Sequence, residues 1–243
     1  MWRPIMNASE IQELITQNAA SYERLNSIIS AGRSSRWNQW VAKHAVRRPN
    51  ARVLDVFSGT GPVGLEAAAL GAKVTIAANT PQLLTMARHK ATKLGVNVDL
   101  ELVNLSRDIA GFSRASFDAV TMAFSTRYRE NPAASYPHLV SLLKPGGRLV
   151  ILEYVVPSGG LTSKFSSVYF FHVLPMVAAL ASKHRKLFTL LTQATKARGC
   201  EEDLELMLLT AGLSITEVQR FGFGLAYGVV STHGSVKRFD AIA

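Results

Sequence analysis

Cysteine is almost absent from this chain of 243 residues, in which Cys200 is the single example. One cysteine excludes an intramolecular disulfide and argues against a zinc cluster or an iron–sulfur site. A long hydrophobic run is missing as well, because the most apolar stretch, residues 168–181, is too short to span a bilayer and contains His172 and Pro175. The N-terminus turns polar at once and shows no secretory signal. We therefore expect a cytoplasmic protein that touches a membrane only at its surface.

Acidic residues are missing from two long segments. Every charged side chain is basic between Glu23 and Asp55, and again between Glu153 and Glu201. The whole chain carries a formal net charge of +10, from 27 Lys and Arg against 17 Asp and Glu. Two basic faces of this kind suit an anionic partner such as a membrane surface or nucleic acid, and ordinary solvated surface is the alternative. The basic residues are Arg24, Arg33, Arg36, Lys43, Arg47, Arg48 and Arg52 in the first segment, and Lys164, Lys183, Arg185, Lys186, Lys196 and Arg198 in the second.

The order of the predicted elements indicates an α/β protein. Apolar strands alternate with helices, which implies a parallel sheet covered on both faces. A fifth strand follows a Pro-Gly-Gly turn, and residues 201–234 return to a helix and then to two strands in an antiparallel finish. The first four strands are predicted at residues 52–57, 73–79, 98–104 and 117–124, with helices from Leu65 to near Gly71 and from Pro81 to Gly95.

We expect a single domain over residues 1–243. Residues 1–48 are predicted to form helices before the sheet, beginning at a capping box made by Ser9 and Gln12. Residues 156–200 are apolar and basic without strand alternation, and they are predicted to form a helical lid. The lid would lie over the C-terminal edge of the sheet, where ligands of such folds bind.

A glycine-rich turn follows the first strand. Gly59, Gly61 and Gly64 fit the pattern G-x-G-x-x-G, which by itself is a weak sign of a dinucleotide site. Asp55 stands four residues earlier, inside the strand, and an acid there suits a cationic ligand better than a diphosphate. S-adenosylmethionine carries a sulfonium and an ammonium group and no phosphate, so "VLDVFSGTG" indicates the first motif of a class I methyltransferase. An Asp that caps a turn in an unrelated α/β protein is the alternative.

Several segments together resemble one family, the UbiE/COQ5 C-methyltransferases, which methylate the ring of ubiquinone and menaquinone precursors. The matching pieces are "SYERLNSIISAG", "VLDVFSGTG", "SFDAVTMAFSTR", "LLKPGGRLVILEY", "YFFHVLP" and "GVVSTHG". They occur in order, and "FHVLP" and the N-terminal Tyr-x-x-x-Asn pattern are the more specific ones. The resemblance implies a Rossmann-like methyltransferase fold with a mostly parallel seven-stranded sheet, in a family that is often dimeric and acts on lipid-tailed quinols.

The cofactor contacts that the resemblance implies are unevenly present. Thr60 in the glycine loop is kept, but the acid that holds the ribose falls on Ala78. The polar residue beside the adenine falls on Ser106, and the serine after the fourth strand falls on Ala123. A lost charge-assisted hydrogen bond costs roughly 1.5–3 kcal/mol, so the change at Ala78 alone would weaken binding about ten- to a hundredfold.

Other polar residues are candidates to replace these contacts. Asn79 or Thr80 would serve the ribose, and Asn104 or Asp108 the adenine. The predicted cofactor-binding residues are Asp55, Ser58, Gly59, Thr60, Gly61, Asn79, Ser106 and Ala123.

Methylation of a ring carbon needs a carbon nucleophile, made by deprotonating a quinol hydroxyl, and it needs no metal. The resemblance gives Arg127 the role of holding the phenolate or orienting a water that acts as base, and a surface arginine on a loop is the alternative. His172 titrates in the range needed to accept a proton, and a packed core histidine fits it equally well. The predicted substrate contacts are Tyr22, Asn26, Glu153 and Tyr169, each of which plain packing or a structural role would also explain.

Two other enzyme classes fit less well. Asn79 without an acid resembles some NADP sites, but the position of Asp55 and the "LKPGG" segment argue against a nicotinamide oxidoreductase. A nucleic-acid methyltransferase would use the positive charge, yet "NPPY"-type motifs are absent. We therefore expect no nucleic-acid partner and assign the basic faces to anionic lipid.

The sequence thus predicts an S-adenosylmethionine-dependent C-methyltransferase acting on a quinol or phenol. A homodimer and a peripheral membrane contact are further expectations. The alternative is a methyltransferase-fold protein with weak or no use of S-adenosylmethionine, which catalyses a non-methylating reaction or binds a small molecule.

Overall fold

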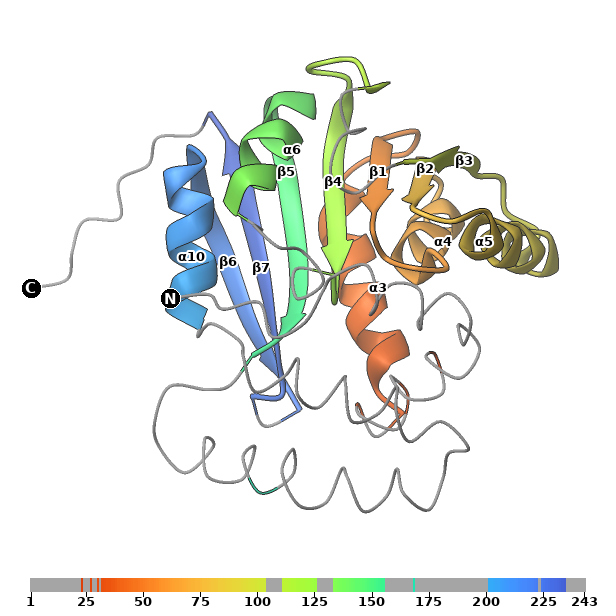
Figure 1. The fold of residues 1–243 in the computed structure, drawn as a ribbon, viewed down its shortest axis with the longest axis horizontal. Helices are drawn as coiled ribbons and strands as arrows, with labels where there is room; N and C mark the ends of the chain where they lie inside the picture. The colour runs from red at the N-terminus through yellow and green to blue at the C-terminus, as the bar shows by residue number, and fades with distance from the viewer. Residues whose placement is uncertain are drawn as a thin grey trace, which may run out of the picture.

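The computed structural model describes residues 32–103, 111–125, 133–155, 201–222 and 224–234, together with Glu23, Ser27, Ser30 and Val168. Its centre is a seven-stranded sheet in the order β3-β2-β1-β4-β5-β7-β6 (Figure 1). Neighbouring strands from β3 to β5 are parallel, whereas β7 is antiparallel to both β5 and β6. The fold class predicted from the sequence, including the antiparallel finish, is confirmed. The strands are β1 (Arg52–Val56), β2 (Lys73–Ala78), β3 (Asp99–Leu102), β4 (Phe117–Ala123), β5 (Leu143–Tyr154), β6 (Leu213–Phe221) and β7 (Ala226–His233).

Helices cover both faces of the sheet (Figure 1). Side chains of α3, α4 and α5 share one apolar cluster with Val53 of β1. Those of α6 and α10 share another with Leu54 and Val56, so successive residues of β1 alternate between the two faces. None of the described helices is long and apolar enough to cross a membrane. The described helices are α3 (Ser34–Ala45), α4 (Pro62–Ala69), α5 (Pro81–Leu94), α6 (Tyr136–Leu142) and α10 (Glu201–Thr210), with a short 3-10 helix η3 (Ala133–Ser135) before α6.

Local sequence signals set the ends of the helices beside the turn. Thr80 precedes α5 and its hydroxyl accepts a bond from the N–H of Leu83 at 3.4 Å, while Gly95 ends the helix with a φ of 67°. These are the bounds predicted from Pro81 and Gly95. Helix α4 begins at Pro62, earlier than predicted, because Gly61 adopts a φ of 69° and turns the chain directly into the helix.

The Pro-Gly-Gly turn predicted before the fifth strand is instead a bulge within β5. Phe117 of β4 pairs with Leu143, and Ala119, two residues on, pairs with Arg148, so residues 144–147 stand out of the ladder. Glycine is needed there, because Gly146 has a φ of 74°. A Cβ on Gly147 would lie 2.8 Å from the carbonyl oxygen of Lys144. The bulge lies at the amino end of β4, away from the glycine-rich turn.

The structure describes different shares of the two helical regions predicted from the sequence, residues 1–48 and 156–200. Helix α3 lies within residues 1–48, before the sheet, and most of the rest of that predicted helical region lies outside the described residues. The capping box at Ser9 lies outside the described residues, as does the predicted lid at residues 156–200 apart from Val168.

Candidate cofactor site

The turn at residues 57–61 joins β1 to α4 at the carboxyl edge of the sheet. β1, β2 and β4 are parallel neighbours, so their ends at Val56, Ala78 and Ala123 meet at this edge. The strand order reverses between β1 and β4, and ligands of open parallel sheets bind outside the strand ends at such a reversal. The edge that holds the turn is therefore the candidate site.

Asp55 ties together the elements that form the turn. Its carboxylate is fully buried and accepts bonds from Ser58 Oγ at 2.6 Å, Thr121 Oγ1 of β4 at 2.8 Å and the N–H of Gly64 in α4 at 2.9 Å. Burial raises the pKa of Asp55, against the opposing effect of these bonds. Both oxygens are bonded within the protein, so the structure gives Asp55 the role of holding the turn. Its direct contact with a cationic ligand stays a prediction.

The glycines in the turn and at the start of α4 are explained by different physical reasons. A Cβ on Gly61 would lie 2.6 Å from Ile76 Cδ1, and one on Gly64 would lie 2.8 Å from Ile76 Cγ1, so both positions let the turn pack on β2. Gly59 has a φ of 66°, and a Cβ there would meet no atom of the described residues within 4 Å. Among those residues the backbone at Gly59 is therefore uncovered at the carboxyl edge, where a ligand would be able to approach it closely.

Thr60 belongs to a polar cluster on the turn that sequence reasoning missed. Its buried hydroxyl donates to Glu23 and accepts a bond from Lys90 Nζ of α5 at 2.8 Å. Lys90 also forms an ion pair with Glu23. Glu23 and Lys90 are 67 positions apart in the sequence, and no local pattern joins them. The cluster fixes the turn to α5 and commits the Thr60 side chain to protein partners.

The end of β2 carries no carboxylate. Ala78 is buried and packs with Leu83 of α5. Asn79 follows it, half-buried and in contact with other groups of the protein. The position at which the family places its ribose acid is thus an apolar contact between β2 and α5, and the predicted role of Asn79 stays a prediction.

The end of β4 carries a buried hydroxyl. Ala123 is buried there, and Phe124 next to it has a φ of 55°. Ser125 follows, 2% exposed, and its Oγ has no hydrogen-bond partner among the residues that the structure describes. A buried hydroxyl without a partner is uncommon and indicates a ligand or water that completes it. The sequence had pointed to Ala123 as a lost serine contact, whereas the structure has a serine two residues later at the same edge.

An aromatic wall lies beside the end of β4. Phe124 and Tyr154 stack with ring centroids 4.2 Å apart and an interplanar angle of 26°, and Trp37 of α3 meets the Tyr154 ring edge-on at 6.2 Å. Glu153, predicted as a substrate contact, is buried near the end of β5 opposite Tyr227 of β7. Six further predicted site residues lie outside the described residues, namely Tyr22, Asn26, Ser106, Arg127, Tyr169 and His172.

S-adenosylmethionine fits this edge in two respects. Within the described part of the chain, no atom covers the backbone at Gly59, and the Ser125 hydroxyl is a buried polar atom without a partner. The carboxylate that would hold a ribose diol is missing at Ala78. The described residues would therefore hold the cofactor through the turn after β1 and through the end of β4.

Comparisons with known proteins agree with this geometry. A family model described as the ubiE/COQ5 methyltransferase family matches residues 5–237. A demethylmenaquinone methyltransferase of Deinococcus radiodurans is 34% identical over 218 residues, which cover 89% of this chain and 89% of that protein. The ubiquinone/menaquinone biosynthesis C-methyltransferase UbiE of Hahella chejuensis is 28% identical over 232 residues, with coverages of 94% and 92%.

A solved structure shares the fold. The magnesium protoporphyrin IX methyltransferase of Synechocystis PCC 6803, solved with bound SAH (S-adenosylhomocysteine), superposes with a TM-score of 0.67 at 16% identity, covering 93% of this chain and 99% of that one. The chain belongs to the ubiE/COQ5 methyltransferase family and is an S-adenosylmethionine-dependent methyltransferase.

Proposed function

We propose that this enzyme methylates a ring carbon of a prenylated quinol of the demethylmenaquinone class. The proposal is supported above all by the turn after β1, which Asp55 holds at the carboxyl edge of the sheet through its bonds to Ser58, Thr121 and Gly64. The Deinococcus radiodurans relative, named for demethylmenaquinone, supports the choice of substrate class.

The residues of the chain have three tasks in such a reaction. S-adenosylmethionine supplies the methyl group from its sulfonium. The protein orients the quinol carbon in line with that methyl, excludes water and stabilises the phenolate. Phe124, Tyr154 and Trp37 are buried and pack together, so the core beside the β4 and β5 ends at this edge is apolar.

In this reaction the residues predicted to be catalytic have separate roles. Arg127 holds the phenolate or orients a water, and His172 accepts the hydroxyl proton. Tyr22, Asn26, Glu153 and Tyr169 contact the substrate. We also propose that the two basic segments contact an anionic membrane that holds the quinol. The enzyme further forms a homodimer in this proposal.

One observation favours a second candidate function. Ala78 is buried against Leu83 at the strand end where the family has its ribose acid. An enzyme without that contact would bind S-adenosylmethionine weakly and use the same pocket for a non-methylating reaction, since one fold hosts many chemistries.

The location of the cofactor is tested by Gly59→Ala with Gly95→Ala as a matched control. Both glycines have nearly the same φ, 66° and 67°, and a Cβ meets no atom within 4 Å at either. The backbone strain, about 1–2 kcal/mol, should therefore lower the melting temperature equally. Titration calorimetry should show that SAH binds at least about tenfold more weakly to Gly59→Ala only. Equal SAH binding by both variants and the wild type would remove the cofactor from this turn.

The reaction is tested with a reduced demethylmenaquinone analogue and S-adenosylmethionine. Mass spectrometry of the quinone product should show the addition of one methyl group on a ring carbon. Binding of SAH without transfer to any quinol or phenol acceptor would favour the second candidate function.

A further inference from the structure

A basic pocket lies at the end of the sheet opposite the candidate cofactor site. It has a volume of about 360 Å³ and is bordered by the end of α3, the start of β4 and the bulge of β5. Arg52 begins β1 at this end, three residues before Asp55, which corresponds to about 10 Å along the strand. The pocket is therefore separate from the cofactor turn and is of a size that holds a small ligand group.

The charge of this pocket is strongly unbalanced. Four cationic side chains line it, and Asp118 is its only acidic lining residue among the described residues. Two of the cations come from the first acid-free segment of the sequence, one from the β5 bulge and one from the residue directly after the bulge. The four are Arg47, Arg48, Lys144 and Arg148.

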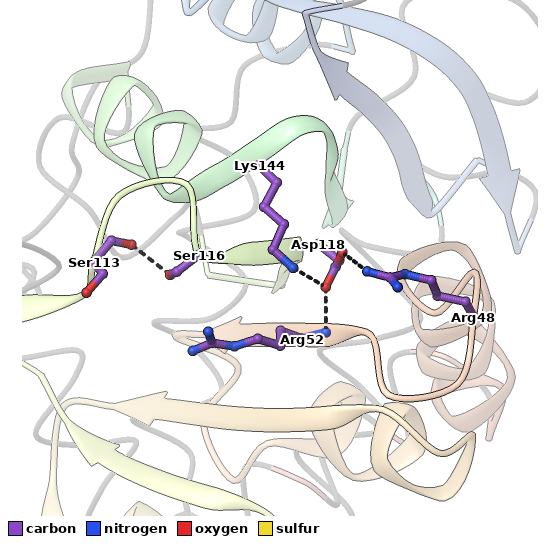
Figure 2. A network of polar contacts seen from close by, with 6 residues as sticks. All are labelled: Arg48, Arg52, Ser113, Ser116, Asp118 and Lys144. Carbon is purple, nitrogen blue, oxygen red and sulfur yellow. Dashed lines mark hydrogen bonds and ion pairs between the residues drawn. The ribbon is translucent and has the colours of Figure 1, made fainter.

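Asp118 holds two of the cations in place. Arg48 Nη2 lies 2.9 Å from one of its oxygens, and Lys144 Nζ lies 2.8 Å from the other (Figure 2). The backbone N–H of Arg52 also donates to Asp118 at 2.9 Å. Burial alone would raise the pKa of Asp118, but the bonds from Lys144, Arg48 and Arg52 outweigh it and lower the pKa well below its usual range. One carboxylate thus positions two cations and neutralises only one charge.

The other two cations have no such partner. In the part of the chain that the structure describes, no carboxylate forms an ion pair with Arg47 or Arg148. Arg148 donates to the backbone carbonyl oxygen of His44 at 3.2 Å. The charge of Glu217 favours protonated Arg148, but the Glu217 carboxylate lies 3.0 Å from Nε2 of the His44 side chain. The pKa of Arg148 is lowered mainly by burial and, second, by the positive charge of Arg47. The two guanidinium groups therefore repel each other, and the carboxylate of Asp118 forms its ion pairs with the other two cations.

We propose that this pocket binds a phosphate group, either on a soluble small molecule or on the headgroup of an anionic lipid. A phosphate carries up to two negative charges and accepts bidentate bonds from guanidinium groups, which are the groups left unpaired here. Arg47 and Arg148 would bind it directly, and Asp118 would position Arg48 and Lys144 beside it. The proposal does not rest on the substrate or the reaction of the cofactor site.

The test measures binding of inorganic phosphate and diphosphate to the full chain by titration calorimetry. Arg47→Gln/Arg148→Gln removes the two unpaired cations, and Arg47→Gln alone removes an exposed residue with less risk to folding. The matched control is Arg88→Gln/Lys93→Gln, which makes the same change of charge on the exposed face of α5. SAH binding by every variant, measured in parallel, reports whether the fold and the cofactor site are intact.

We expect the double variant to bind diphosphate at least about tenfold more weakly than the wild type, the single variant a few-fold more weakly, and the control unchanged. Binding to vesicles of phosphatidylcholine with and without phosphatidic acid distinguishes a phosphate on a lipid headgroup from a phosphate on a soluble molecule. Binding to phosphatidic acid vesicles alone, lost in the double variant, assigns the site to a lipid headgroup, whereas binding of free diphosphate assigns it to a soluble ligand. Binding of none of these probes, or an equal loss in the control, would overturn the proposal.

Discussion

Replacing Asp55 with asparagine tests whether this carboxylate organises the cofactor turn. The substitution keeps the size and shape of the side chain but offers one acceptor oxygen in place of two. Three donors point at the carboxylate, from Ser58, Thr121 and the backbone of Gly64. The Gly64 N–H cannot reverse its role, so the amide oxygen must serve it, and the amide NH2 then faces the two hydroxyls.

The expected loss follows from those two hydroxyls. Each exchanges a hydrogen bond to a charged group, worth roughly 1.5–3 kcal/mol, for a neutral one worth roughly 0.5–1.5 kcal/mol. The asparagine variant should therefore lose about 2 kcal/mol of unfolding free energy. For a chain of this length that corresponds to a fall of about 4–8 °C in the melting temperature. The turn would also be less well held, and we expect SAH to bind at least about tenfold more weakly.

The pH dependence of the loss has a defined sign. Because burial raises the pKa of Asp55 in the folded state, its stabilising contribution is complete below the unfolded value of 3.8 and declines as the pH rises through the folded value. The asparagine variant has no such decline, so the difference in unfolding free energy between wild type and variant should narrow as the pH rises above about 4.

Urea unfolding and SAH calorimetry measure the two effects of Asp55→Asn. Asp99→Asn is the control, since it makes the same chemical change at an exposed carboxylate at the start of β3. If Asp55→Asn and the control unfold at the same urea concentration and bind SAH equally, the three bonds to Asp55 do not hold the turn.

Three further substitutions test other parts of the structure. Gly61→Ala should lower the unfolding free energy by about 1–3 kcal/mol more than Gly95→Ala. Both substitutions strain the backbone, but only the first would place a Cβ 2.6 Å from Ile76 Cδ1. Equal losses of unfolding free energy, measured by urea unfolding, would contradict the packing argument. Ala78→Asp should lower the melting temperature of the free protein, because it buries a carboxylate. The same variant should bind SAH about tenfold more tightly, because the new carboxylate can hold the ribose. Weaker SAH binding in calorimetry would mean that another group already occupies the place of the ribose acid. Asp118→Asn should be destabilising near neutral pH, and the effect should shrink progressively as the pH falls below about 4, because the stability contributed by a carboxyl of lowered pKa is complete above its unfolded pKa and is lost as the pH falls through its folded pKa. A difference in unfolding free energy that does not change with pH would refute this.

The sequence predicts the sheet well because its signals are local. Runs of apolar residues mark the strands, and Pro81 and Gly95 mark the ends of α5 at the residues where the structure has them. The β5 bulge was predicted as a turn, because the letters "KPGG" are compatible with either. Only the pairing of Leu143 with Phe117 across the sheet makes the segment part of a strand.

The candidate site is less predictable because it is assembled from distant residues. Glu23 and Lys90 meet at Thr60 across 67 positions of sequence, and no local pattern links them, although Glu23 lies inside the N-terminal Tyr-x-x-x-Asn pattern. The role of Asp55 was predicted from its charge, whereas the structure places it in a buried network that charge alone does not indicate. Ser125 was overlooked because the family pattern directs attention to Ala123, and only the burial of its unpartnered hydroxyl singles it out.

Two carboxylates in neighbouring strands show how one sheet keeps two different environments at its two ends. Asp55 and Asp118 lie on paired strands, yet burial raises the pKa of the first, while cationic and backbone donors lower that of the second. Asp55 is surrounded by neutral donors and can organise a turn without attracting an anion. Asp118 is surrounded by cations that exceed its own charge, so its end of the sheet remains an attractive place for a phosphate. The same strands that present the cofactor turn at one edge thus assemble the basic pocket at the other.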